Sequence, residues 1–277
     1  MRWDRGHNSP NLEDRRGQGG GSVNILGLAG LLPLVGRLGW KGILLVVAVF
    51  LLVQYTGVCS QGDDGPAPSS LQSEESRTSA PADELVHFVG YVLDDAQASF
   101  QDDFERAGKR YVPARLVVFS DGTSSGCGGA SSAVGPFYCP LDQRVYIDLS
   151  FYRELHRRFG APGDFAQAYV IAHEIGHHVQ NQLGGLEQGD RKASIDTELQ
   201  ADCLAGMWAA DAQRRQQLEA GDMNEALDAA AAVGDDNIQR QTSGHVQPET
   251  WTHGSSEQRQ RAFKKGFDGG TLQSCGF

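Results

Sequence analysis

The stretch from Ala172 to His178 reads Ala-His-Glu-Ile-Gly-His-His and contains a His-Glu-x-x-His motif. A separation of four residues brings His173 and His177 to the same face of a helix, where both imidazoles can bind one metal ion. This arrangement is typical of zinc sites. Glu174 projects from the flank of that face, so its carboxylate can take a proton from an activated water. The motif therefore predicts a zinc-dependent hydrolase with Glu174 as general base.

The same pattern also arises by chance, so the residues around it matter. Asp164 is the expected N-cap of a helix, Gln167 completes a capping box, and Gly184 is the expected stop. Between these points apolar residues recur every three or four positions and form a buried stripe beside the two histidines. The motif is therefore predicted to lie in a helix packed against a core, which metal ligands require for rigidity.

A third protein ligand is expected, because catalytic zinc sites usually have three. Glu198 and Asp202 lie four residues apart on the next predicted helix and therefore share a face. We predict that Glu198 is the third ligand and that Asp202 receives the N–H of a ligating histidine. A solvated acidic face is the alternative interpretation of this pair.

Several stretches together resemble one protein family. They are residues 11–17 (Asn-Leu-Glu-Asp-Arg-Arg-Gly), residues 135–140 (Gly-Pro-Phe-Tyr-Cys-Pro), residues 145–184, residues 198–206, and residues 252–255 (Thr-His-Gly-Ser) with Gln258 and Arg259. On these residues the chain resembles the neutral zinc metallopeptidase family of bacterial membrane-anchored proteins, which is related in site pattern to the glutamate-ligand zincins. The resemblance implies one Zn²⁺ ion, a peptide or protein substrate, and an α+β zincin-like domain that is mostly helical with a small sheet. It also implies that a strand edge beside the metal helix binds the extended substrate, and the segment ending at Leu149 is the candidate.

Other residues near the motif have less specific roles. His253 lies in a loop-rich stretch before the last predicted helix, and we predict that it stabilises the oxyanion formed during hydrolysis. A loop or capping histidine is the alternative. His178 points about 100° away from His177, so we expect a satisfied or exposed neighbour of the site. The basic residues of the last helix are expected on a solvated face; they are Arg259, Arg261, Lys264 and Lys265.

Residues 42–58 are predicted to form a transmembrane helix, because residues 43–53 contain no polar side chain and Arg37 and Lys41 precede them. A buried core helix is the alternative. Residues 1–41 are then a cytoplasmic tail with a basic flank, disordered at 1–22, residues 59–82 are a flexible linker, and residues 83–277 are an extracytoplasmic domain. The expected location is the cell membrane, with a single crossing. The net charge of −11 argues against nucleic acid as a partner.

The cysteines fit an oxidising compartment. We predict disulfides between Cys127 and Cys139 and between Cys203 and Cys275. A zinc–thiolate cluster is the rival, but the chain has no Cys-x-x-Cys spacing. Cys59 is left over beside the predicted membrane helix, where lipidation is an alternative.

Two other functional classes stay open. The domain could be a catalytically inactive, zinc-stabilised interaction module of the cell envelope, although a purely structural site has no need for the base Glu174. It could also be an intramembrane protease, but Gln180, Asn181 and Gln182 make the motif helix too polar for a membrane interior.

Overall fold

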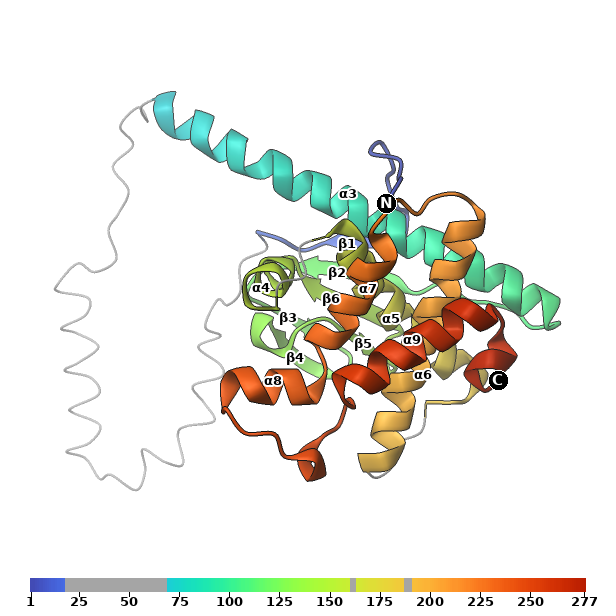
Figure 1. Cartoon of the computed structure of the whole chain (residues 1–277). Helices are drawn as coiled ribbons and strands as arrows, with labels where there is room; N and C mark the ends of the chain where they lie inside the picture. The colour runs from blue at the N-terminus through green and yellow to red at the C-terminus, as the bar shows by residue number, and fades with distance from the viewer. Residues whose placement is uncertain (18–68, 160–162, 187–190) are drawn as a thin grey trace, which may run out of the picture. The chain divides into compact units, whose positions relative to one another are not determined.

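A mixed four-stranded sheet supports the helices of the domain (Figure 1). The computed structural model describes residues 1–17, 69–159, 163–186 and 191–277. The strands lie in the order β1 (Leu12–Asp14), β2 (Arg115–Phe119), β6 (Arg144–Asp148) and β5 (Phe137–Cys139). Strand β2 pairs in parallel with β1 and β6, whereas β5 pairs antiparallel with β6. Strand β5 is therefore an edge of this sheet.

The two faces of the sheet are covered by different elements. Leu116 and Val118 of β2 belong to the main core with the helices, whereas Val117 and Phe119 belong to a second cluster with Ala130. This alternation follows from the two-residue repeat of a strand. Ala130 lies in the hairpin formed by β3 (Gly122–Ser125) and β4 (Gly128–Ser131). Helices thus cover one face and the hairpin contacts the other.

Helices make up most of the described chain. They are α3 (Ser69–Arg106), α4 (Ser150–Phe159), α5 (Asp164–Leu183), α6 (Arg191–Arg214), α7 (Asp222–Ala232), α8 (Asp235–Thr242) and α9 (Ser256–Gly269), with 3-10 turns η2 (Ser132–Val134), η3 (Pro248–Thr250) and η4 (Leu272–Cys275). The fold class is therefore α+β, mostly helical with a small sheet, as the sequence predicted. Residues 115–119 and 145–149 are rich in Val, Ile, Tyr and Phe, which predicts strands there. Strands β2 and β6 confirm this prediction, whereas β1, β3, β4 and β5 were not predicted.

Helix α5 begins in a different way from the one predicted. Its N-cap is Gly163, which makes no side-chain cap. Asp164 instead contacts the terminal amine of Met1 at 2.6 Å, and Glu225 of α7 accepts the backbone N–H of Phe165 at 3.0 Å. The predicted capping box at Asp164 is therefore wrong, because a carboxylate from another helix satisfies the free N–H group. The predicted end is confirmed, since Gly184 closes the helix with a φ of 77°.

Both predicted disulfides are present. Cys127–Cys139 joins the turn of the β3–β4 hairpin to the last residue of β5, and Cys203–Cys275 joins α6 to η4. A loop of 12 or 72 residues closed in this way removes conformational freedom from the unfolded chain. The bonds therefore hold the edge strand and the C-terminal turn in place.

Residues 1–17 belong to the domain, so the prediction of a disordered tail is wrong for them. Strand β1 pairs with β2 from Leu12 to Asp14. The ring of Trp3 packs edge-on against Phe88 of α3, with 5.3 Å between the ring centroids. His7 and Asn11 each lie 2.8 Å from the carboxylate of Asp94. Each of these contacts joins residues 1–17 to a part of the chain that is distant in the sequence. A search for apolar periodicity detects only local structure, so it cannot reveal such contacts.

This pairing contradicts the predicted single crossing of a membrane. Residues 1–18 and 79–277 form one compact unit. One crossing between them would place β1 and β2 on opposite sides of about 30 Å of hydrocarbon, and strands cannot hydrogen-bond over that distance. The placement of residues 1–41 in the cytoplasm and of residues 83–277 outside is therefore corrected, because β1 and the domain lie on the same side.

The predicted membrane helix at residues 42–58 and the unpaired Cys59 lie outside the described residues. Within the described part of the chain, no helix combines the length and the apolar character that a bilayer crossing requires. The predicted linker at 59–82 is wrong from Ser69 onward, because α3 begins there. The apolar repeat of the sequence predicts a helix that starts only at Asp83. The Ser, Gly, Pro and acidic residues of the predicted linker suggested a tether, but Ser and Glu carry only small penalties in a helix.

Because β1 and the rest of the domain lie on the same side of any membrane, two residues near β1 and α3 should be open to crosslinking in the full chain. Arg16 Nη2 lies 3.1 Å from Asp83 Oδ1. Arg16→Cys combined with Asp83→Cys, in a Cys59→Ser background, should therefore be joined by a short bis-maleimide in intact cells. Mass spectrometry of the linked peptides measures this, with the two single-cysteine variants as controls. Cysteines that are labelled only from opposite sides of a membrane would contradict the arrangement.

Candidate metal centre

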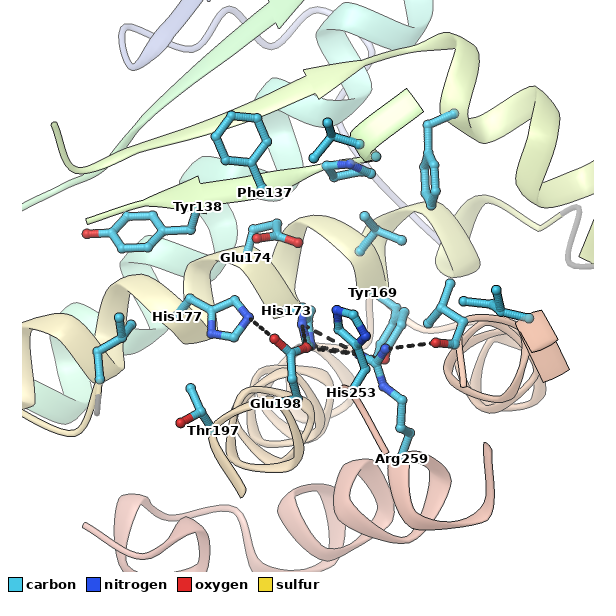
Figure 2. Close-up of a pocket in the computed structure, with 18 residues that line it drawn as sticks. Phe137, Tyr138, Tyr169, His173, Glu174, His177, Thr197, Glu198, His253 and Arg259 are labelled. Carbon is cyan, nitrogen blue, oxygen red and sulfur yellow. Dashed lines mark hydrogen bonds and ion pairs between the residues drawn. The ribbon is translucent and has the colours of Figure 1, made fainter. Parts of the chain in front are cut away.

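Helices α5 and α6 meet at Gly176, which lies between the two motif histidines. A Cβ atom at position 176 would lie 2.9 Å from the carbonyl oxygen of Ala201. Real Cβ atoms do not come so close to backbone, so glycine is required for this approach. Glu198 precedes Ala201 by about one helical turn. The close packing therefore brings Glu198 to the face of α5 that carries His173 and His177 (Figure 2).

The predicted ligand residues are brought together. Glu198 Oε2 lies 3.2 Å from His173 Nε2, and Glu198 Oε1 lies 3.4 Å from His177 Nε2. One ligand atom from each of the three residues lies within 4.8 Å of the others. Ligand atoms of a tetrahedral zinc ion with bonds of about 2.0 to 2.1 Å are roughly 3.3 Å apart. The donor set and its spacing therefore fit one zinc ion.

The opposite nitrogen of each histidine is held by a hydrogen bond. His173 Nδ1 donates to Asp202 Oδ1 at 2.9 Å, as the sequence predicted. His177 Nδ1 donates to Gln180 Oε1 at 2.8 Å, and Gln180 Nε2 donates to the carbonyl oxygen of Thr197, which fixes the orientation of the amide. Both rings therefore carry their proton on Nδ1 and present Nε2 to the metal position.

Gln180 was not identified from the sequence, although a signal existed. It follows His177 by three residues, so the two side chains are neighbours on α5. Arg259 was assigned to a solvated face, which is wrong. Its side chain is buried, with 4% of the residue exposed. It binds Asp202 through Nε at 2.8 Å and Nη2 at 2.9 Å, so it orients the carboxylate that orients His173.

The buried charges of the centre favour a divalent cation. Three carboxylates, those of Glu174, Glu198 and Asp202, face one cationic side chain, that of Arg259. Burial opposes ionisation of Asp202, but Arg259 and His173 outweigh it and hold its pKa at about 2. Burial also opposes a charge on His173, yet Asp202 and Glu198 raise its pKa to about 10. The carboxylates therefore attract positive charge to the histidine nitrogens.

The centre opens into a cleft of about 510 Å³. Glu174 lines the cleft, and Phe137 and Tyr138 of β5 form the opposite wall in Figure 2. The prediction that the segment ending at Leu149 offers the strand edge is wrong, because β6 is paired on both sides. The strand edge beside the metal helix belongs to β5.

A histidine of the motif helix fixes the position of β5. His178 is fully buried and donates from Nε2 to the carbonyl oxygen of Val112 at 2.7 Å. Its Nδ1 then accepts the hydroxyl of Tyr138 at 2.9 Å, while Asn181 donates to the same hydroxyl at 2.8 Å. Burial lowers the pKa of His178, which keeps the ring neutral for these bonds. His178 is therefore a satisfied neighbour of the site, as predicted.

His253 lines the same cleft from the loop between η3 and α9. Its Nδ1 lies 3.1 Å from Asp235 Oδ1, and its side chain is half exposed. Asp235 Oδ2 also accepts the backbone N–H groups of Thr252, His253 and Gly254. The hydrogen bond that His253 Nδ1 donates to Asp235 is the largest influence on the pKa of His253 and raises it. The sequence indicated His253 but not Asp235, which lies 18 residues earlier.

Comparison with known proteins supports the zinc assignment. The whole chain, residues 1–277, matches the family described as "Putative neutral zinc metallopeptidase". The chain belongs to this family. The chain is similar to "Uncharacterized protein YpfJ" of Escherichia coli (strain K12), which is 42% identical over 291 residues that cover 99% of this chain and 98% of the relative.

A second similar protein matches a smaller part of the chain. "Uncharacterized protein Rv2575" of Mycobacterium tuberculosis (strain ATCC 25618 / H37Rv) is 48% identical over 182 residues, which cover 60% of this chain and 62% of the relative. No solved structure matches the chain. The comparisons therefore assign the family and its metal but no substrate.

A second group of acidic residues has a different environment. Asp164, Asp222 and Glu225 also lie close enough together to hold a metal ion. However, the terminal amine of Met1 lies 2.6 Å from Asp164 and 3.3 Å from Asp222, and Glu225 accepts a backbone N–H. These carboxylates already have partners and lack histidine, so they do not resemble a zinc site.

We expect Gln180→Ala to weaken zinc binding about ten- to hundredfold, because His177 loses the group that orients its ring. Gln182→Ala is the matched control, since Gln182 contacts Val112 and His178 but neither of the two metal-binding histidines. Competition with a zinc chelator, followed by metal analysis, measures the affinity of both variants. Equal affinities would show that Gln180 does not orient His177.

Proposed function

We propose that this protein is a zinc-dependent peptidase in which His173, His177 and Glu198 hold one ion. A zinc ion there would supply a Lewis acid that polarises the scissile carbonyl and activates a water. The observation that carries the proposal is the position of Glu174. Its carboxylate lines the cleft beside the three ligand residues, and among the described residues no group hydrogen-bonds it. It is therefore available for proton transfer.

The environment of Glu174 suits a general base. Burial is the largest influence on its pKa and raises it, although the neighbouring histidines oppose this shift. A carboxylate with a raised pKa accepts a proton more readily. In the proposed reaction Glu174 takes a proton from the attacking water and delivers it to the leaving amine. A peptide bond is thereby hydrolysed without any further acid or base from the chain.

We also propose that the substrate backbone pairs with the free edge of β5. An extended peptide can add a strand to an exposed sheet edge through main-chain hydrogen bonds. Strand β5 forms one wall of the cleft, and the Tyr138 hydroxyl is tied to α5 through His178 and Asn181. These contacts fix the distance between the edge and Glu174. The scissile bond would thus be presented to the base in a constant position.

The proposed place of action is a membrane surface outside the cytoplasm. The disulfides Cys127–Cys139 and Cys203–Cys275 support an oxidising compartment. Residues 42–58 are proposed as the attachment, on the basis of their apolar sequence. Because β1 and β2 share one sheet, both strands would lie on the same side of that membrane.

Glu174→Gln tests the assignment of the base. The amide cannot accept the proton, so kcat for a cleaved peptide should fall by about two to four orders of magnitude while one zinc ion per chain is retained. Glu257→Gln is the matched control, because Glu257 is exposed on α9 and pairs only with Arg261 in the described chain. Turnover and metal content of both proteins are measured together. An unchanged kcat in Glu174→Gln would refute the role.

A pH profile tests His253 as the donor to the oxyanion. With Nδ1 bound to Asp235, Nε2 can donate only in the protonated ring, so activity should be present below the raised pKa and lost as pH rises through it. Asp235 and Glu198 raise this pKa, and Arg259 lowers it. Asp235→Asn should therefore shift the basic limb of kcat/KM to lower pH.

The control for this profile is Asp236→Asn, which alters a neighbouring carboxylate on α8 that contacts Arg240 and Ser256. Its basic limb should coincide with that of the unmodified protein. A basic limb that stays in place in Asp235→Asn would exclude His253 as the titrating donor.

A further inference from the structure

Four apolar side chains line part of the cleft, and one of them lies on the same helix as the general base. Val170 of α5 precedes Glu174 by four residues, so it occupies the same face of the helix one turn away. Phe151 of α4 lines the cleft with it, Val233 contributes from the end of α7, and Ile238 contributes from α8. We call these four residues the apolar wall.

A glycine keeps the space in front of this wall open. Gly135 has a φ of 78°, which disfavours other residues. A Cβ atom at this position would lie 3.9 Å from the ring of Phe151, so any side chain here would project toward the wall. Gly135 lines the cleft just before β5, the strand with which the substrate backbone is proposed to pair. A substrate residue alongside β5 can therefore reach Phe151.

None of the four residues of the apolar wall can pair with a charged substrate group. Outside the metal centre, the described residues that line the cleft carry charge only at Arg259 and His253. Every nitrogen of Arg259 already donates a hydrogen bond, Nε and Nη2 to Asp202, Nη2 also to Tyr169, and Nη1 to the carbonyl oxygen of Val233. Arg259 is thus not free to bind a substrate carboxylate, and a charge buried there without a partner would be costly.

We infer that the apolar wall binds a bulky apolar side chain next to the scissile bond, so the substrates are peptides or proteins with residues such as Phe or Leu at that position. This inference rests on the proposed peptidase function. Burial of such a side chain favours binding, whereas an acidic or basic one would lose its hydration. The preference for an apolar over a charged residue should be about tenfold or more in affinity.

The test separates binding from hydrolysis. Peptides of Ala, Gly and Ser with one central Phe, Leu, Asp or Lys are titrated against the zinc-loaded Glu174→Gln protein by fluorescence anisotropy. The same peptides are given to the unmodified protein to score cleavage. Ile238→Lys, which places a charge on the wall, is added to the Glu174→Gln background. Val246→Lys is the matched control, because Val246 is exposed after α8 and does not line the cleft.

The Phe and Leu peptides should bind about tenfold more tightly than the Asp and Lys peptides. Ile238→Lys should lower the affinity for the Phe peptide and raise the affinity for the Asp peptide. Val246→Lys should change neither affinity. If the Phe and Leu peptides bind more tightly but the unmodified protein cleaves none of the peptides, the inferred role of the apolar wall in binding would be supported. The peptidase function would then be refuted. Equal affinities for all four peptides, or equal effects of the two lysine variants, would overturn the inference.

Discussion

The close contact of α5 with α6 at Gly176 is the constraint on which the site depends. It allows a carboxylate from one helix to reach two imidazoles on another. A third helix is added by a similar approach, since a Cβ at Gly266 of α9 would lie 1.8 Å from the carbonyl oxygen of Cys203. This approach brings Arg259 of α9 to Asp202. Small residues at helix crossings thus assemble groups that are far apart in the sequence.

The ligand residues of the centre are held by hydrogen bonds with neighbouring side chains, and these are held in turn by further contacts. Nε2 of each histidine faces Glu198, whereas the Nδ1 atoms are held by Asp202 and Gln180. Arg259 then neutralises Asp202, and the disulfide at Cys203 anchors α6 beside it. With neutral imidazoles the remaining buried charge matches a divalent ion, so metal binding should also stabilise the folded domain. Chemistry and stability therefore depend on the same contacts.

The parts of the structure that local pattern determines were predictable. The motif, the helices α5 and α6, the strands β2 and β6, the Asp202 contact and both disulfides follow from spacing and composition. Long-range contacts were not predictable. Strand β1 pairs with residues about a hundred positions later, and the burial of Arg259 depends on a partner in another helix. A charged residue on an amphipathic helix gives no local sign of such a partner.

The central claim is that His173, His177 and Glu198 bind one zinc ion. X-ray absorption spectroscopy of the full chain loaded with one equivalent of zinc tests it most directly. We expect a four-coordinate ion with two imidazole nitrogens and oxygen ligands, and the loss of one imidazole in His177→Ala. A spectrum without imidazole, as expected for binding at Asp164, Asp222 and Glu225, or one with sulfur ligands, would contradict the account.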